Sequence, residues 1–172
     1  METSEAIRMK VGELTVDPTS KTPIVVLRDA ENRLSLPIWI GGLEANAVAS
    51  ELEGFKVSRP QTHDLLTNIL QEASIEVLSV AICDIRENTY HAEITLRSGE
   101  NTWSTDARPS DAIALALRAK CEIWVAKHVL EQSSMVADED AGADNTNLSS
   151  VEPEKWSEIL QDMGPDDFKY KM

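Results

Sequence analysis

Residues 106–112 read Asp-Ala-Arg-Pro-Ser-Asp-Ala and place four polar side chains directly before a segment that has none. Pro109 suits the first turn of a helix, where its missing N–H costs nothing. Asp106 and Arg108 are then expected at the helix entrance, with Ser110 and Asp111 in the first turn. Every residue from 112 to 117 is apolar, and such a helix must be covered on most sides. The stretch therefore predicts a polar helix start held in a fixed place.

Two interpretations of this helix start remain open. In the first it is a capping network, because Asp111 favours the positive end of the helix and Arg108 could pair with either carboxylate. In the second, Asp106 and Asp111 are oxygen ligands for a hard divalent cation, and Arg108 holds a phosphate. Two acids five residues apart do not decide between them.

A second polar helix start is predicted after the loop that contains Arg59. Thr62 is expected to cap a helix with His63 and Asp64 in its first turn. A histidine at this position is more often a solvated or capping side chain than a ligand, and an aspartate is usually a partner of the helix dipole. The residues of this helix that are expected to face inward are Leu65, Leu66, Ile69 and Leu70.

The remaining pattern predicts an α/β (α+β) fold, with helices packed on a mixed, largely antiparallel sheet. A further helix, with Glu44 on its polar face, is expected between Gly42 and Gly54. Pro37 lacks an N–H and indicates an edge strand or a bulge. The strands are expected near residues 7–17, 24–27, 34–40, 75–85, 90–97, 101–105 and 123–125.

The chain has 172 residues, of which 42% are hydrophobic, and this is enough for one domain and a tail. We expect one compact domain over residues 1–132. Residues 133–150 are rich in small polar residues without periodicity, and they are expected to form a flexible linker. A short acidic helix and tail are expected over 151–172. On this division, truncation after Gln132 should leave the domain folded.

The net charge is −14 and the pI is about 4.5, opposite to the basic surface of a protein that holds nucleic acid by charge alone. Residues 133–172 carry 10 acids and 3 bases, a net charge of −7. Cys83 and Cys121 lie in apolar surroundings without a preceding signal peptide, which favours reduced thiols in the cytoplasm. No apolar run is long enough to span a membrane.

Several separated motifs follow one another in the chain: Leu36-Pro37-Ile38-Trp39-Ile40-Gly41, Glu44, Arg59-Pro60-Gln61-Thr62-His63-Asp64-Leu65-Leu66 and Asp106-Ala107-Arg108-Pro109-Ser110-Asp111-Ala112. Taken together and in this order, they resemble the bifunctional nuclease domain family. The resemblance covers roughly residues 5–132, and the acidic tail, which ends with Phe168-Lys169-Tyr170-Lys171-Met172, also looks like that of bacterial members. It implies a compact α/β domain that self-associates and a nuclease activity on both DNA and RNA.

Phosphodiester hydrolysis needs an activated water and neutralisation of the charge that develops on the phosphate. Histidine moves protons near neutrality, so His63 is the candidate general base or acid, and Asp64 and Asp111 complete the candidate catalytic set. Arg59, Arg108 and Ser110 are the candidate phosphate contacts. The candidate ligands for a Mg²⁺ or Mn²⁺ ion are Glu44, Asp64, Asp106 and Asp111.

The rival hypothesis is a non-enzymatic, oligomeric interaction module, in which the same polar residues are caps and ion pairs and the acidic tail recruits a partner. It agrees better with the negative charge. Under either hypothesis we expect a homo-oligomer, because the helix over residues 112–117 and the alanine-rich helix after Gly42 offer more apolar surface than one small sheet can cover. No zinc motif, glycine-rich nucleotide loop or acyl-transfer triad is present in the sequence.

Overall fold

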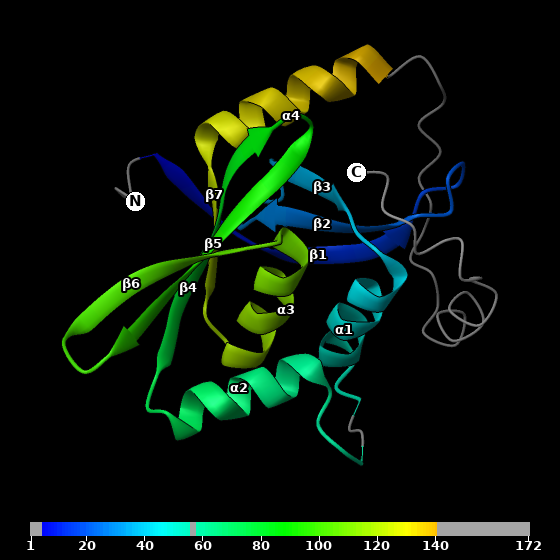
Figure 1. Cartoon of the computed structure of the whole chain (residues 1–172). Coiled ribbons are helices and arrows are strands. Elements are labelled where there is room, and N and C mark those ends of the chain that lie inside the picture. The colour runs from blue at the N-terminus through cyan, green and yellow to red at the C-terminus, as the bar shows by residue number, and fades with distance from the viewer. Residues whose placement is uncertain (1–4, 56–57, 141–172) are drawn as a thin grey trace.

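The computed structural model describes residues 5–55 and 58–140. They form seven strands and four helices (Figure 1). The strands are β1 (Ala6–Val16), β2 (Pro23–Asp29), β3 (Ser35–Trp39), β4 (Glu76–Arg86), β5 (Thr89–Ser98), β6 (Asn101–Ala107) and β7 (Glu122–Ala126). The helices are α1 (Gly42–Leu52), α2 (Thr62–Glu72), α3 (Pro109–Ala119) and α4 (Lys127–Asp140).

All seven strands belong to one sheet, in the order β3-β2-β1-β7-β4-β5-β6. Only β4 and β7 pair in parallel, and every other neighbouring pair is antiparallel. The predicted mixed, largely antiparallel sheet is confirmed. Pro37 lies in the edge strand β3, as its missing N–H predicted. Strand β7 enters between β1 and β4, and it thereby joins two meanders that are far apart in the sequence.

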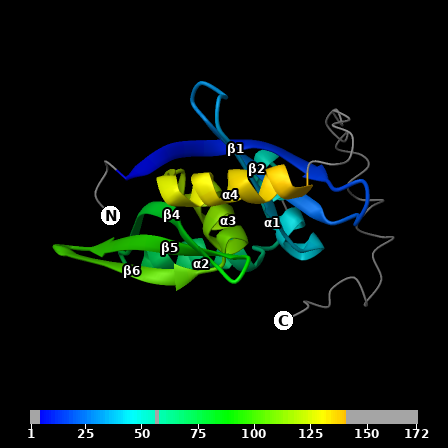
Figure 2. The ribbon, with the colours of Figure 1, turned by 90° about the horizontal axis from the view of Figure 1, so that it is seen from above.

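Helices α1, α2 and α3 lie together on one side of the molecule, and α4 lies on the other (Figures 1 and 2). The central helix of the group is α3, which contacts both α1 and α2 as well as strands β4, β5 and β7. Helix α4 contacts β3, β4 and β7 instead. The helix with the polar start is therefore enclosed by elements from both halves of the chain.

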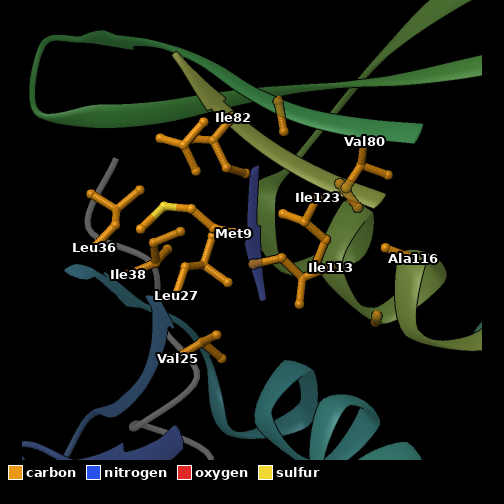
Figure 3. Close-up of a cluster of buried hydrophobic side chains, with 14 of the residues drawn as sticks. Met9, Val25, Leu27, Leu36, Ile38, Val80, Ile82, Ile113, Ala116 and Ile123 are labelled. Atoms are coloured by element: carbon orange, nitrogen blue, oxygen red, sulfur yellow. The ribbon is translucent and has the colours of Figure 1, made fainter. Parts of the chain in front are cut away.

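The hydrophobic core lies between α3 and the strands. Figure 3 shows side chains of β1–β3, such as Met9 and Leu27, directed toward Ile82 of β4 and Ile113 of α3. Residues 112–116 of α3 are each at most 1% exposed. Burial of this apolar stripe against the sheet stabilises the fold and fixes the position of the helix. The start of α3 is thus anchored, as predicted.

The burial of α3 shows that the reason for expecting a homo-oligomer was wrong. The apolar surface of α3 is covered within a single chain, and Ala45 and Val48 of α1 are fully buried as well. Helix α3 packs on β4, β5 and β7, and α1 packs mainly on α3, an arrangement that the sequence pattern did not reveal. These two helices therefore do not supply the extra apolar surface on which the prediction rested.

Helix α2 also departs from the prediction. Leu65, Leu66 and Ile69 are exposed rather than buried, and Leu70 alone of the four packs against the core. The three exposed side chains lie outside the side of α2 that packs on α3. In the described structure no further layer covers them. The residue that caps α2 is Gln61, one position before Thr62.

The predicted linker begins too early. Helix α4 continues to Asp140, so residues 133–140 are helical. Its first turns are anchored in the core by Val129 and Leu130, and the Tyr90 hydroxyl donates to Ser133 Oγ at 3.3 Å. A truncation after Gln132 would therefore cut through a packed helix. The rest of the predicted linker and the acidic tail lie outside the described residues.

Within residues 5–55 and 58–140, no helix has the length and apolar character needed to cross a membrane.

Candidate functional site

Three helices begin at the candidate site, and each contributes a polar side chain from its first turn or its cap. Helix α1 contributes Glu44 and α2 contributes His63. Helix α3 contributes its N-cap residue Arg108 and, one turn later, Asp111. We refer to Glu44, His63, Arg108 and Asp111 as the helix-start cluster. The positive ends of three helix dipoles favour its two carboxylates.

The members of the helix-start cluster are joined by direct polar contacts. His63 Nε2 lies 3.2 Å from Asp111 Oδ1. The Arg108 guanidinium donates from Nε to Asp111 Oδ2 at 2.6 Å and from Nη2 to Oδ1 at 3.1 Å. Its Nη1 lies 2.8 Å from Glu44 Oε1. Arg108 and Asp111 form the predicted capping pair, but the contacts to α1 and α2 go beyond what a local cap requires.

The cluster is covered on one side and open on the other. The side chains of Glu44 and His63 are each 15% exposed, whereas that of Arg108 is 52% exposed. A ligand from solvent would therefore meet the guanidinium first. Since a guanidinium binds phosphate oxygens by charge-assisted hydrogen bonds, the exposed member of the cluster has the chemistry of a phosphate contact.

Asp111 is held in its charged form. Burial alone would raise the pKa of its carboxyl group, but the hydrogen bonds and charges of Arg108 and His63 outweigh burial and lower the pKa below the ordinary value of 3.8. The carboxylate is thus an acceptor at neutral pH. It can fix the orientation of the His63 ring by accepting a hydrogen bond from Nε2, which leaves Nδ1 as the nitrogen that can take up a proton.

Asp64 does not join the helix-start cluster. Its Oδ1 accepts a 2.6 Å hydrogen bond from Nε of Arg118, and its Oδ2 accepts one of 2.8 Å from the backbone N–H of Gln61. The bond from Arg118 is the main reason that the pKa of Asp64 is lowered. The predicted metal ligand is thus the partner of an arginine that is only 4% exposed.

Sequence reasoning missed Arg118. A signal was present, because Arg118 follows Asp111 by seven residues and therefore lies two turns further along the same face of α3. Arg118 directly follows six apolar residues, 112–117, and a charged side chain that is buried with them needs a partner. What the sequence could not give was the identity of that partner.

Three further predicted site residues are placed outside the contacts of the cluster. Strand β6 extends to Ala107, so Asp106 is exposed on this strand opposite Glu93 instead of at the helix entrance. Ser110 is 5% exposed, which leaves little surface for a substrate. Arg59 is exposed in the loop before α2.

The four carboxylates do not fit a divalent cation as they are arranged. Glu44 and Asp111 share the guanidinium of Arg108, Asp64 is paired with Arg118, and Asp106 lies elsewhere. In the described part of the chain, no three histidine, cysteine, aspartate or glutamate side chains gather closely enough to hold a metal ion. Carboxylates are suitable donors for Mg²⁺ or Mn²⁺, but here the positive charge beside them is supplied by arginine.

The fold and the cluster define a class of protein: an α+β domain in which three helix starts bring a histidine, an arginine and two carboxylates together. Residues 25–138 match the family described as the bifunctional nuclease domain. The chain belongs to this family, as its motifs predicted.

Relatives are found in bacteria and plants. An uncharacterised protein of Mycobacterium tuberculosis (strain ATCC 25618 / H37Rv) is 35% identical over 162 residues, which are 94% of this chain and 97% of the relative. Bifunctional nuclease 2 of Oryza sativa subsp. japonica is 30% identical over 64% of this chain and 35% of its own length. Bifunctional nuclease 1 of Arabidopsis thaliana is 26% identical over 66% and 36%. The plant similarity therefore concerns one shared domain of longer proteins.

Proposed function

We propose that this protein hydrolyses phosphodiester bonds in DNA and RNA at the helix-start cluster. Membership of a family whose plant members are named bifunctional nucleases supports the proposal. The observation that carries it is the contact between His63 and Asp111 beside the half-exposed Arg108. A proton acceptor, a residue that orients it and a phosphate-binding cation are three parts that such a reaction needs.

In the proposed reaction, Arg108 binds the phosphate oxygens and stabilises the charge that develops on them. His63 takes a proton from a water molecule at Nδ1 while Nε2 donates to Asp111. The water oxygen forms a bond to phosphorus as the bond from phosphorus to the leaving oxygen breaks. The leaving oxygen then receives a proton from the imidazolium, which restores neutral His63. Asp111 stabilises the imidazolium between these two proton transfers.

A requirement for Mg²⁺ or Mn²⁺ is a separate proposal that comes from the residue types alone. The steps above run without such an ion, because Arg108 supplies the positive charge next to Asp111 and Glu44. Chelator and added metal in the nuclease assay test the requirement directly.

The proposed activity is tested by cleavage of single-stranded DNA and of RNA, with magnesium, with manganese or with chelator. His63→Ala is expected to lower the rate about 100-fold or more, because general acid–base catalysis contributes this much. His128→Ala is the matched control, since His128 Nε2 also lies near an aspartate, at 3.5 Å from Asp84 Oδ1, but outside the cluster. Its activity should equal that of the wild type.

Identical purification of the three proteins excludes a contaminating nuclease. Activity that survives unchanged in His63→Ala would refute the proposed site. A wild type that cleaves neither substrate under any metal condition would favour the non-enzymatic interaction module. The ion pairs of Arg108 with Glu44 and Asp111, together with the net charge of −14, are the observations that support this second candidate.

We also propose that the chain self-associates through α2. Leu65, Leu66 and Ile69 form an exposed apolar stripe on this helix. Two copies of a chain with net charge −14 repel each other, so contact is least unfavourable through uncharged side chains such as those of the stripe. A two-fold interface would place the same stripe on both copies.

Leu66→Glu is expected to convert the oligomer to a monomer, because it puts a negative charge at the centre of the stripe on both partners. Light scattering after size exclusion at micromolar concentration measures the change. Leu43→Glu, at an exposed leucine of α1, is the control and should leave the mass unchanged. A monomeric wild type would contradict self-association, and an oligomer that survives Leu66→Glu would exclude α2 as its interface.

A cytoplasmic location is proposed from the thiols. Cys83 and Cys121 are free. Burial raises the pKa of both, that of Cys121 to about 11, so at neutral pH they are inert thiols rather than reactive thiolates. Thiols that remain reduced are typical of a reducing compartment.

A further inference from the structure

The Arg118 guanidinium joins all three helices that form the helix-start cluster. Its Nε donates to Asp64 Oδ1 of α2 at 2.6 Å. Its Nη1 donates to the backbone carbonyl oxygen of Ala47 in α1 and to that of Ala114 in α3, at 3.0 Å each. Figure 1 shows these helices side by side. The side chain is 4% exposed, so these bonds are shielded from water.

Each helix is held close to the residue that it contributes to the cluster. On α1, Ala47 follows Glu44 by three positions, and on α3, Ala114 follows Asp111 by three positions. Residues three apart are neighbours on the surface of a helix. On α2, Asp64 is next to His63. Arg118 therefore acts within one helical turn of the cluster on all three helices.

A buried guanidinium tolerates little movement of its partners. If one helix slid along another, an N–H of the buried Arg118 side chain would lose its partner away from water. Unpaired buried polar groups are strongly disfavoured, and buried charges more so. The bonds of Arg118 thus favour one relative placement of α1, α2 and α3.

We propose that Arg118 is the positioning residue of the site. By fixing α2 against α1 and α3, it holds the His63 ring at hydrogen-bonding distance from Asp111, although its own hydrogen bonds go to Asp64, Ala47 and Ala114. Its effect on a reaction rests on the proposed nuclease function. Its effect on the contact between His63 and Asp111 does not, and this difference separates the two proposals experimentally.

Two measurements on the full chain test the role of Arg118. The ring ¹⁵N signals of His63 report which nitrogen carries the proton and whether it is hydrogen-bonded, and cleavage kinetics give kcat and KM separately. The variants are Arg118→Met and Arg118→Lys. In Arg118→Met/Asp64→Leu the buried pair is replaced by apolar side chains, a change that often preserves stability. Arg28→Met breaks a 2.6 Å pair with Glu13 on strands β1 and β2 and is the control.

Arg118→Met and the double variant are expected to shift the His63 ring signals toward those of Asp111→Asn. They should lower kcat roughly 10- to 100-fold with a smaller change in KM, because small misplacements of catalytic groups have effects of this size. Arg118→Lys keeps the charge and should recover part of both. Arg28→Met should change neither.

The double variant keeps the test decisive if Arg118→Met does not fold. A folded protein without Arg118 whose His63 ring signals match the wild type would overturn the positioning role. The positioning role would also be overturned if the kcat of such a protein stayed within two-fold of the kcat of an active wild type. If the wild type has no nuclease activity, the proposed function fails, while the ring signals still decide the role of Arg118.

Discussion

Asp111→Asn is expected to lower kcat for DNA and RNA cleavage roughly 10,000-fold, an effect typical of losing the carboxylate that orients a catalytic histidine. Asparagine has one acceptor oxygen where aspartate has two. Both oxygens of Asp111 accept from Arg108, and Oδ1 also faces His63 Nε2. In one orientation the NH2 group of the asparagine faces the Nε–H of Arg108, so two donors meet and this hydrogen bond is lost. In the other it donates to His63 Nε2, which places the ring proton on Nδ1 and removes the proton acceptor.

The fold should tolerate Asp111→Asn well. The change removes an ion pair at a partly exposed helix start, and this costs about 1 kcal/mol because asparagine still favours the position. Asp84→Asn is the matched control, since Asp84 also lies between an arginine and a histidine. Rates and melting curves are measured together. Asp111→Asn activity within ten-fold of an active wild type would remove Asp111 from the mechanism, and a large loss of stability would assign it to the fold instead.

The second large effect is expected on stability. Asp64→Asn leaves the charged Arg118, at 4% exposure, without a charged partner. Leaving a buried charge without its partner costs about 3 kcal/mol, at the low end for such pairs because the Asp64 side chain is itself 30% exposed. A chain of this size loses about 2–4 °C of melting temperature per kcal/mol, so melting near pH 7 should fall by roughly 6–12 °C.

The loss should depend on pH in a defined direction. The folded pKa of Asp64 is lowered from 3.8, mainly by the hydrogen bond from Arg118. A lowered folded pKa stabilises the native state above the unfolded pKa, and the contribution disappears as pH falls through the folded value. The difference in melting temperature between wild type and variant is therefore full near pH 6–7 and shrinks below about pH 4.

Asp17→Asn is the control for this prediction. Asp17 also has a lowered pKa, but mainly through the backbone N–H of Thr19 in an exposed turn, and asparagine can accept the same bond. Its melting temperature should stay within about 2 °C of the wild type. An Asp64→Asn protein that melts with the wild type at pH 7, or a difference that does not shrink as the pH falls below about 4, would contradict the importance of the pair of Asp64 with Arg118.

Local patterns in the sequence were sufficient for the seven strands, for helices α1 to α3 and for two members of the cluster, His63 and Asp111. Pro109 begins α3 as its fixed geometry predicts, and Pro37 lies in an edge strand because it cannot donate to a ladder. The separated motifs were sufficient for the family. His63 and Asp111 were selected by residue type and by their place at helix starts. All of these inferences depend on interactions within a few residues, and such interactions are readable from the chain alone.

Only the tertiary structure decided which side chains meet. The contact of His63 with Asp111 joins residues 48 positions apart, and the bonds of Arg118 reach across 54 and 71 positions to Asp64 and Ala47. Periodicity shows that a helix has a buried side, but not which helix covers it. For this reason α3 is enclosed while the apolar stripe of α2 stays exposed. The sequence shows that Asp64 is a carboxylate, but not which residue it contacts. The packing of three helices makes it the partner of Arg118.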